Sequence, residues 1–256
     1  MVGREREFAA LQLAWRAAGR MVLVRGSAGI GKSRLVRELA ERVRAAGGTV
    51  LAGRCSPTAA DVPFRPLREA LLAAARTGLR PSAEVAPFLP SLGSLVPEWV
   101  AARDASLDGG AIVLAEGLLR LMVAWSSPEV PALLVIEDMQ WSDRETINAV
   151  EYLADNLAGH PALVIVTLRG GEPGPGADLM EALHVRRAIQ PVDLFPLEPA
   201  QSEVNGARYA LPCRRRWKLF IQASRVAPAS WPPASPSRRA CASVPLTCGS
   251  RRPAAR

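Results

Sequence analysis

A glycine-rich segment near the N-terminus constrains the fold of this chain more than any other feature. Residues 26–33 read Gly-Ser-Ala-Gly-Ile-Gly-Lys-Ser, which fits the pattern G-x-x-x-x-G-K-[ST] of a phosphate-binding loop. An apolar run at residues 21–24 precedes this segment, and apolar residues at helical spacing follow it between Leu35 and Val43. The pattern therefore stands between a predicted strand and a predicted helix, as a P-loop requires.

Every position of this loop is a candidate for nucleotide binding. The glycines let backbone N–H groups turn toward the phosphates, and the start of the helix adds a partial positive charge. We expect the Lys32 ammonium to reach the β- and γ-phosphates and the Ser33 hydroxyl to bind Mg²⁺. The predicted cofactor-binding residues are Gly26, Ser27, Ala28, Gly29, Ile30, Gly31, Lys32, Ser33 and Arg34.

The alternative is a glycine turn that happens to precede a lysine. The chain has only two lysines, Lys32 and Lys218. A chance match is therefore on the order of one in a thousand.

Two acids follow the apolar run at residues 132–136. The carboxyl ends of parallel strands share one edge of a sheet, so we expect Glu137 and Asp138 to lie beside the P-loop. One acid there can hold Mg²⁺ or its waters, and a neighbouring acid can orient an attacking water. Glu137 and Asp138 are thus the candidate catalytic residues, and together with Ser33 the candidate metal ligands. We assign Glu137 to the metal side and Asp138 as its partner.

The next apolar run, residues 162–167, leads to Arg169. We expect Thr167 and Arg169 to face the γ-phosphate and to sense its presence, the alternative being a solvated arginine at a loop entrance. Trp141 and Asp143 are expected to fix the loop near the acids, although Trp141 equally fits a packing role.

Apolar runs and helical patterns alternate over the first 200 residues. This alternation predicts an α/β P-loop NTPase fold, a mostly parallel five-stranded sheet with helices on both faces. We expect strands at residues 21–24, 49–52, 132–136, 162–167 and 189–194, and helices at residues 33–44, 66–75, 111–125 and 144–157. Pro191 restricts the last strand to an edge or a bulge, and Ser142 is the expected N-cap of the last helix.

Two other segments read differently. Four prolines between residues 78 and 108 predict short helical turns and loops, and residues 170–176 are predicted to form a flexible loop.

The basic charge of the chain belongs to its C-terminal part. Residues 1–201 hold 21 Lys and Arg against 23 Asp and Glu, whereas residues 202–256 hold 11 against one, within a total of +8. The charge therefore says nothing of what the folded part binds. We expect a P-loop ATPase domain at residues 1–200 and a basic Pro/Arg/Ser-rich tail at residues 201–256, disordered or translated out of frame.

No signal for export or membrane insertion stands out. The N-terminus is charged, and the most apolar stretch, residues 111–125, is too short to cross a bilayer and contains Glu116 and Arg120. We therefore expect a cytoplasmic protein without a membrane partner. None of the four cysteines forms a C-x-x-C pair, so we expect no cysteine metal site or disulfide framework.

These motifs, taken in order, resemble a known family. Val-Gly-Arg-Glu-Arg-Glu (residues 2–7), the P-loop, Leu-Leu-Val-Ile-Glu-Asp-Met-Gln-Trp-Ser-Asp (residues 133–143) and Val-Thr-Leu-Arg (residues 166–169) are similar to the AAA/STAND-type, Orc1-like ATPase domain of large LuxR-type transcriptional regulators. The resemblance implies that ATP and Mg²⁺ are the cofactors, that exchange of ATP and ADP acts as a switch, and that Val2, Gly3 and Arg4 border the adenine. Met139, Gln140 and Ser142 depart mildly from the family pattern.

The larger departure lies beyond Pro199. Family members continue into a helical lid, a winged helix, helical repeats and a helix-turn-helix, none of which residues 201–256 match. We therefore expect a regulator truncated after its ATPase core, with self-association through that core and without sequence-specific DNA binding.

Three alternatives stay open. The nucleotide could be GTP. The chain could be an active P-loop enzyme such as a small-molecule kinase, although residues 78–108 show no acceptor-binding constellation. It could also bind nucleic acid non-specifically through the basic tail, where residues 214–218 combine charge with an aromatic ring.

Overall fold

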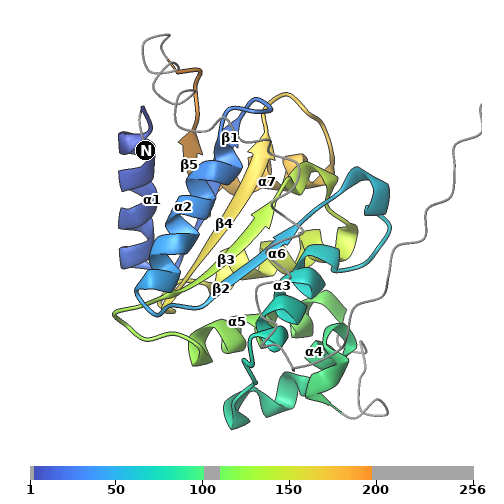
Figure 1. Cartoon of the computed structure of the whole chain (residues 1–256). Coiled ribbons are helices and arrows are strands. Elements are labelled where there is room, and N and C mark those ends of the chain that lie inside the picture. Colours follow the sequence, from blue (N-terminus) through green and yellow to red (C-terminus); the bar gives the residue numbers. More distant parts are fainter. Residues whose placement is uncertain (1–2, 101–109, 198–256) are drawn as a thin grey trace, which may run out of the picture. The chain divides into compact units, whose positions relative to one another are not determined.

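Figure 1 shows the computed structural model of the chain, which describes residues 3–100 and 110–197. The predicted tail at residues 201–256 lies outside the described residues. So do Val2 and residues 101–109.

A five-stranded parallel sheet forms the centre of the described part. The strands are β1 (Arg20–Gly26), β2 (Val50–Arg54), β3 (Ala132–Glu137), β4 (Ala162–Arg169) and β5 (Ile189–Asp193). They lie in the order β2-β3-β4-β1-β5, and all four pairings are parallel. The predicted α/β P-loop NTPase fold with five strands is thus confirmed.

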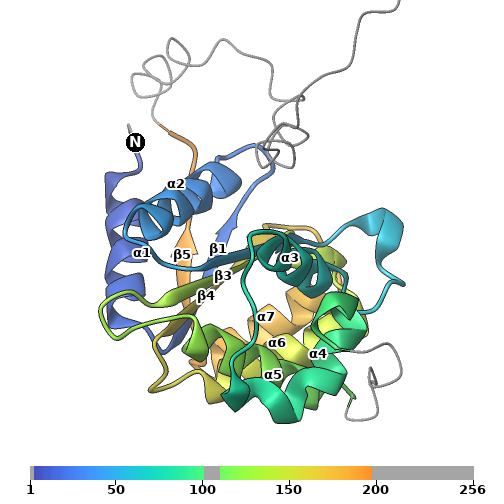
Figure 2. The same cartoon turned by 60° about the horizontal axis from the view of Figure 1, so that its bottom comes forward.

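Helices cover both faces of the sheet, as Figures 1 and 2 show. Helices α1 (Glu5–Ala17) and α2 (Lys32–Ala45) pack on one face, and α3 (Arg65–Arg76), α4 (Leu89–Leu95), α5 (Gly110–Ala124), α6 (Arg144–Asn156) and α7 (Pro175–Val185) lie on the other. Alternate residues of a strand point to opposite faces. Val22 and Val24 accordingly join the core under α1 and α2, whereas Met21 and Leu23 join the core on the other side.

Strand β5 lies at one edge of the sheet, as the proline in it requires. It pairs only with β1 among the described strands, with Pro191 opposite Leu23. Because proline has no N–H to donate, an interior strand would have lost a ladder hydrogen bond there.

Two helices, α1 and α7, were not predicted from the sequence. In α1, Phe8, Leu11 and Ala14 are buried at helical spacing, a signal that the charged residues between them conceal. The predicted loop at residues 170–176 is correct only as far as Gly174, since α7 begins at Pro175, a residue that is favourable in a first helical turn.

The predicted N-cap of α6 is wrong by one residue. The cap is Asp143, whose side chain accepts from the Thr146 backbone N–H at 2.8 Å. Ser142 comes one position too early to reach the first turn of the helix.

The proline-rich region consists of short elements where it is described. These are the 3-10 helix η2 (Ala83–Phe88), helix α4 and the 3-10 helix η3 (Pro97–Trp99). Two more 3-10 helices, η1 (Pro57–Ala59) and η5 (Met139–Trp141), follow β2 and β3. None of the described helices is long and apolar enough to span a bilayer.

Candidate nucleotide-binding site

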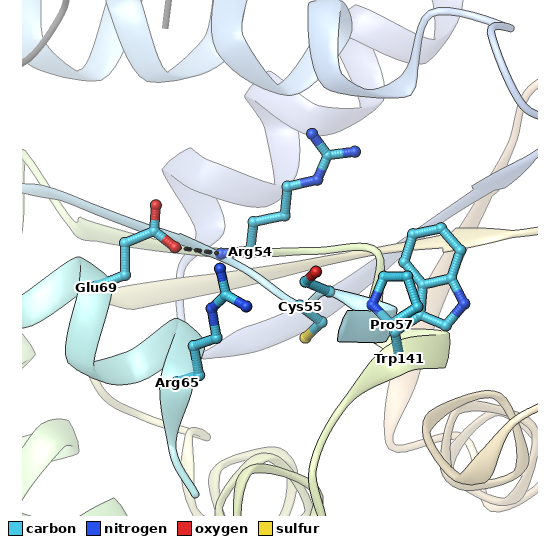
Figure 3. A pocket seen from close by; sticks show the side chains of 7 residues that line it. Arg54, Cys55, Pro57, Arg65, Glu69 and Trp141 are labelled. Atoms are coloured by element: carbon cyan, nitrogen blue, oxygen red, sulfur yellow. Dashed lines mark hydrogen bonds between the residues drawn. The ribbon is translucent and has the colours of Figure 1, made fainter. Parts of the chain in front are cut away.

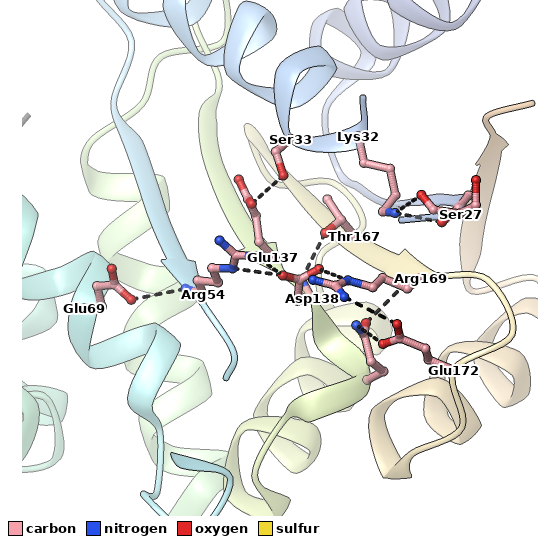
Figure 4. Close-up of polar contacts among 12 residues, drawn as sticks. Ser27, Lys32, Ser33, Arg54, Glu69, Glu137, Asp138, Thr167, Arg169 and Glu172 are labelled. Atoms are coloured by element: carbon pink, nitrogen blue, oxygen red, sulfur yellow. Dashed lines mark hydrogen bonds and ion pairs between the residues drawn. The ribbon is translucent and has the colours of Figure 1, made fainter. Parts of the chain in front are cut away.

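The carboxyl ends of four neighbouring strands place the polar residues of the site at one edge of the sheet. Gly26 ends β1, Arg54 ends β2, Glu137 ends β3 and Arg169 ends β4. Since all the strands are parallel, these ends meet at the same edge, as Figure 4 shows. The expected meeting of the P-loop, the two acids and Arg169 is therefore found.

The P-loop connects β1 to α2 through a backbone that glycine allows. Gly29 and Gly31 have φ angles of 76° and 106°, in a region that other residues rarely adopt. Residues 27–29 are exposed, and Arg34 is exposed in the first turn of α2. Helix α2 begins at Lys32, so the loop leads directly into its positive end.

The Lys32 side chain lies within the loop. It is only 7% exposed, and its Nζ donates to the carbonyl oxygens of Gly26 at 2.7 Å and Ser27 at 2.9 Å. Burial lowers the pKa of this ammonium, an effect that the negative charge of Asp138 partly opposes. The cation is thus held against the backbone that carries the phosphate-binding pattern.

Ser33 and Glu137 meet across the site. The Ser33 hydroxyl donates to Glu137 Oε2 at 2.7 Å, and the Glu137 side chain is buried. A hydroxyl and a carboxylate oxygen are ligands that Mg²⁺ accepts. The residues present therefore fit a magnesium ion, with Ser33 and Glu137 as the groups that would hold it directly or through water.

Asp138 joins two arginines. Its backbone adopts a φ of 58°, and its N–H donates to Thr167 Oγ1 at 3.0 Å. Its Oδ2 accepts from Arg54, and its Oδ1 accepts from Arg169 Nε at 3.3 Å. Thr167 thus holds the backbone of Asp138 in place, and both carboxylate oxygens are engaged by guanidinium groups.

Arg169 is held on several sides. Its guanidinium lies 4.3 Å from the centre of the Trp141 ring and 3.4 Å from Glu172 Oε1, and its backbone N–H donates to Gln140 Oε1 at 3.3 Å. Gln140 Nε2 in turn donates to Glu172 at 3.1 Å. Trp141 therefore both packs and supports the site, so each of the two predicted roles is partly right.

Asp143 fixes two segments near the site. Asp143 caps α6, and its Oδ1 also accepts from the backbone N–H of Phe64 at 3.1 Å. Phe64 immediately precedes α3. The predicted role of Asp143 in loop geometry is confirmed.

Arg4, which precedes α1, contacts the P-loop at Ile30. Its guanidinium donates to the carbonyl oxygens of Ile30 at 3.3 Å and Phe195 at 2.6 Å, and it pairs with Glu7 at 2.8 Å. Arg4 is only 6% exposed. It ties the loop to the segment that follows β5.

A polar hollow of about 280 Å³ lies beside Arg54 and is shown in Figure 3. Its lining includes Arg54, Arg65, Glu69 and Trp141. Helix α3 lies so close to β2 here that a Cβ at Gly53 would overlap the Pro66 carbonyl. This approach places Arg65, the first residue of α3, next to the strand that ends at Arg54.

Sequence reasoning missed Arg54, Gln140 and Glu172. Arg54 had a usable signal, since it follows a predicted strand and strand ends of a parallel sheet share an edge. The sequence marks Gln140 only as a mild departure from the pattern of the family that it resembles. For Glu172 the local sequence holds no signal, because its position depends on the path of the loop between β4 and α7.

Comparison with known proteins agrees with this geometry. Residues 1–166 match the AAA ATPase domain. The chain belongs to this family. The family implies nucleotide binding, usually with Mg²⁺, so the AAA ATPase domain accounts for the P-loop and for the acids that face it. The match ends before Arg169, whose place in the site comes from the structure.

The relatives of this AAA ATPase domain are distant. The chain is 29% identical over 217 residues to an uncharacterised protein of Rhizobium meliloti (strain 1021), covering 75% of this chain and 20% of that protein. Among solved structures, DnaA of Aquifex aeolicus bound to AMPPCP has a TM-score of 0.43 at 13% identity, over 86% of this chain and 55% of DnaA.

A STAND protein of Pyrococcus horikoshii with a tetratricopeptide repeat sensor has a TM-score of 0.41 at 18% identity, over 86% of this chain and 28% of that protein. The chain thus spans about a fifth to just over half of the length of these three proteins.

Proposed function

We propose that this AAA ATPase domain is a nucleotide-dependent switch that binds ATP or ADP together with Mg²⁺. The observation that carries the proposal is the contact of Ser33 with Glu137 beside the P-loop, at the edge where four strands end. A hydroxyl, a carboxylate and the ammonium of a P-loop lysine are the groups that a nucleoside triphosphate with its metal requires, and Ser33, Glu137 and Lys32 can supply them.

Each residue then has a distinct role. Backbone N–H groups of residues 26–33 cradle the phosphates, Lys32 neutralises them, and Ser33 with Glu137 holds Mg²⁺. Asp138 orients an attacking water and holds Arg169 toward the terminal phosphate. The ion would supply charge neutralisation at the phosphates.

Arg4 stabilises the edge of the loop at which the adenine would lie. Its contact with the Ile30 carbonyl supports this role.

Slow turnover fits this site better than rapid catalysis. Both oxygens of Asp138 accept from arginines, so an attacking water would compete with two cations for them. A bound ATP would therefore persist, as a switch requires.

The kind of protein in which this domain acts is also part of the proposal. The motif order resembles LuxR-type transcriptional regulators, so we infer that the module belongs to such a regulator and that it self-associates in its ATP state.

Calorimetry with Mg-ATP, Mg-ADP and Mg-GTP tests the binding. We expect micromolar ATP affinity that Lys32→Ala abolishes, whereas Lys218→Ala, which removes the other lysine of the chain, leaves it unchanged. A phosphate-release assay on the same samples separates a slow switch from an enzyme. If a well-folded wild-type chain binds none of the three nucleotides, the proposed function is wrong.

A further inference from the structure

Arg54 brings a fourth strand to the site. It ends β2, an edge strand, and lies opposite Glu137 in the parallel register of β2 and β3. Figure 4 shows its side chain reaching from β2 toward Asp138, at the edge that Ser33 and Glu137 share. The proposed function draws its phosphate- and metal-binding groups from β1, β3 and β4 and gives Arg54 no contact with the nucleotide.

The contact with Asp138 uses only some of the N–H donors of the Arg54 guanidinium. Its Nε and Nη2 both donate to one oxygen, Oδ2 of Asp138, at 2.9 and 2.5 Å. A guanidinium has five N–H groups, so this contact uses only two of them. The side chain is 46% exposed, against 7% for that of Asp138, so the remaining donors are accessible to a ligand.

Asp138 pairs with two cations at this edge of the sheet. The single carboxylate of Asp138 faces two guanidinium groups, those of Arg54 and Arg169. Arg169 has a second carboxylate partner in Glu172, whereas among the described residues the Arg54 guanidinium pairs with Asp138 alone. Arg54 therefore has one carboxylate partner where Arg169 has two. Arg54 lies on β2, whereas the P-loop follows β1, and β3 and β4 lie between these two strands.

We propose that Arg54 is a further nucleotide-binding residue, one that donates to the terminal phosphate of a bound nucleoside triphosphate and so makes the site prefer ATP to ADP. This inference rests on the proposed function, because it requires phosphates at the P-loop. The fork of donors suits phosphate oxygens, and Asp138 keeps the fork oriented. Arg54 and Arg169 thus approach the terminal phosphate from two sides of Asp138.

The competing explanation is a structural ion pair. In that case Arg54 would only tether β2 to the turn after β3. Its loss would lower the thermal stability of the free chain and weaken ATP and ADP equally. The ratio of the two affinities separates the explanations.

The test measures the dissociation constants of Mg-ATP and Mg-ADP by calorimetry for wild type, Arg54→Ala, Arg54→Lys and Lys32→Ala. Arg65→Ala is the matched control, since Arg65 lines the same hollow, as Figure 3 shows, whereas the described ion pairs of Asp138 are with Arg54 and Arg169. We expect Arg54→Ala to weaken ATP about tenfold or more and ADP less than about twofold. Arg54→Lys should fall between, because it keeps the charge and loses the fork.

Four results would overturn the inference. Equal weakening of ATP and ADP in Arg54→Ala, or no weakening of either, rejects it while loss of binding in Lys32→Ala upholds the proposed function. An equal loss of ATP preference in Arg65→Ala shows that any nearby positive charge suffices, and rejects it too. If the wild-type chain binds neither nucleotide, the proposed function fails and takes the role of Arg54 with it.

Discussion

The Ser33 hydroxyl donates to Glu137 Oε2 at 2.7 Å, which joins two residues 104 positions apart in the sequence. The contact ties the first turn of α2 to the end of β3. These are the two elements that a P-loop fold must bring together to hold a metal ion at bound phosphates. The pair therefore offers a direct test of the magnesium site.

We predict that Ser33→Ala and Glu137→Gln remove the dependence of ATP affinity on Mg²⁺. In excess Mg²⁺ each variant should bind ATP about ten- to a hundredfold more weakly than wild type, because each loses an oxygen that holds the ion or its waters. In EDTA the variants and wild type should bind alike. Calorimetry in both buffers measures the difference.

Glu172→Gln is the control for this prediction. Its carboxylate contacts Gln140 and Arg169 rather than Ser33, so its Mg²⁺ dependence should match that of wild type. A Glu137→Gln chain that still gains affinity from Mg²⁺ would show that Glu137 does not serve the metal.

A second prediction concerns Asp138. We expect Asp138→Asn to keep ATP affinity within about threefold and to lower any phosphate release about a hundredfold, since the amide cannot accept a proton from water. Phosphate release under single-turnover conditions checks the rate, and calorimetry checks the affinity. Lys32→Ala should lose both, which distinguishes a defect in chemistry from a defect in binding. Unchanged release in Asp138→Asn would remove this residue from the reaction.

A third prediction concerns stability. Asp143→Ala removes the cap of α6 and leaves the buried Phe64 N–H without its acceptor. Loss of a cap and of a buried acceptor together should lower the free energy of unfolding by about 3 kcal/mol. Urea denaturation measures this value. Ser142→Ala, at the position that the sequence suggested as the cap, should cost much less, and an equal cost would contradict the structural assignment.

The sequence was sufficient for the strands and for the centre of the site. Buried parallel strands read as continuous apolar runs, and the P-loop and the acids stand at the ends of such runs, so the fold class and the meeting of Ser33 and Glu137 followed from local patterns.

Boundaries and pairings were less accessible to sequence reasoning. Ser142 and Asp143 are both good N-caps, and only the path of the chain decides between them. The approach of Arg54 to Asp138 depends on the neighbouring position of β2 and β3 in the sheet, which local periodicity does not encode. Sequence patterns thus identify where the strands end. The order and register of the strands decide which of these ends lie close enough to form an ion pair.

The last prediction uses Cys55, which follows Arg54 and is 2% exposed. Burial raises the pKa of its thiol from 9.0 to about 12. At pH 8 the folded chain should therefore alkylate at Cys55 roughly a thousandfold more slowly than the urea-unfolded chain, because only the thiolate reacts. The raised pKa also makes a contribution to stability that is present below about pH 9 and is lost as pH rises toward 12, and Cys55→Ala should lack that loss. Iodoacetamide labelling read by mass spectrometry of the Cys55 peptide measures the rate, and equal labelling of folded and unfolded chains at pH 8 would show that this end of β2 is open to solvent.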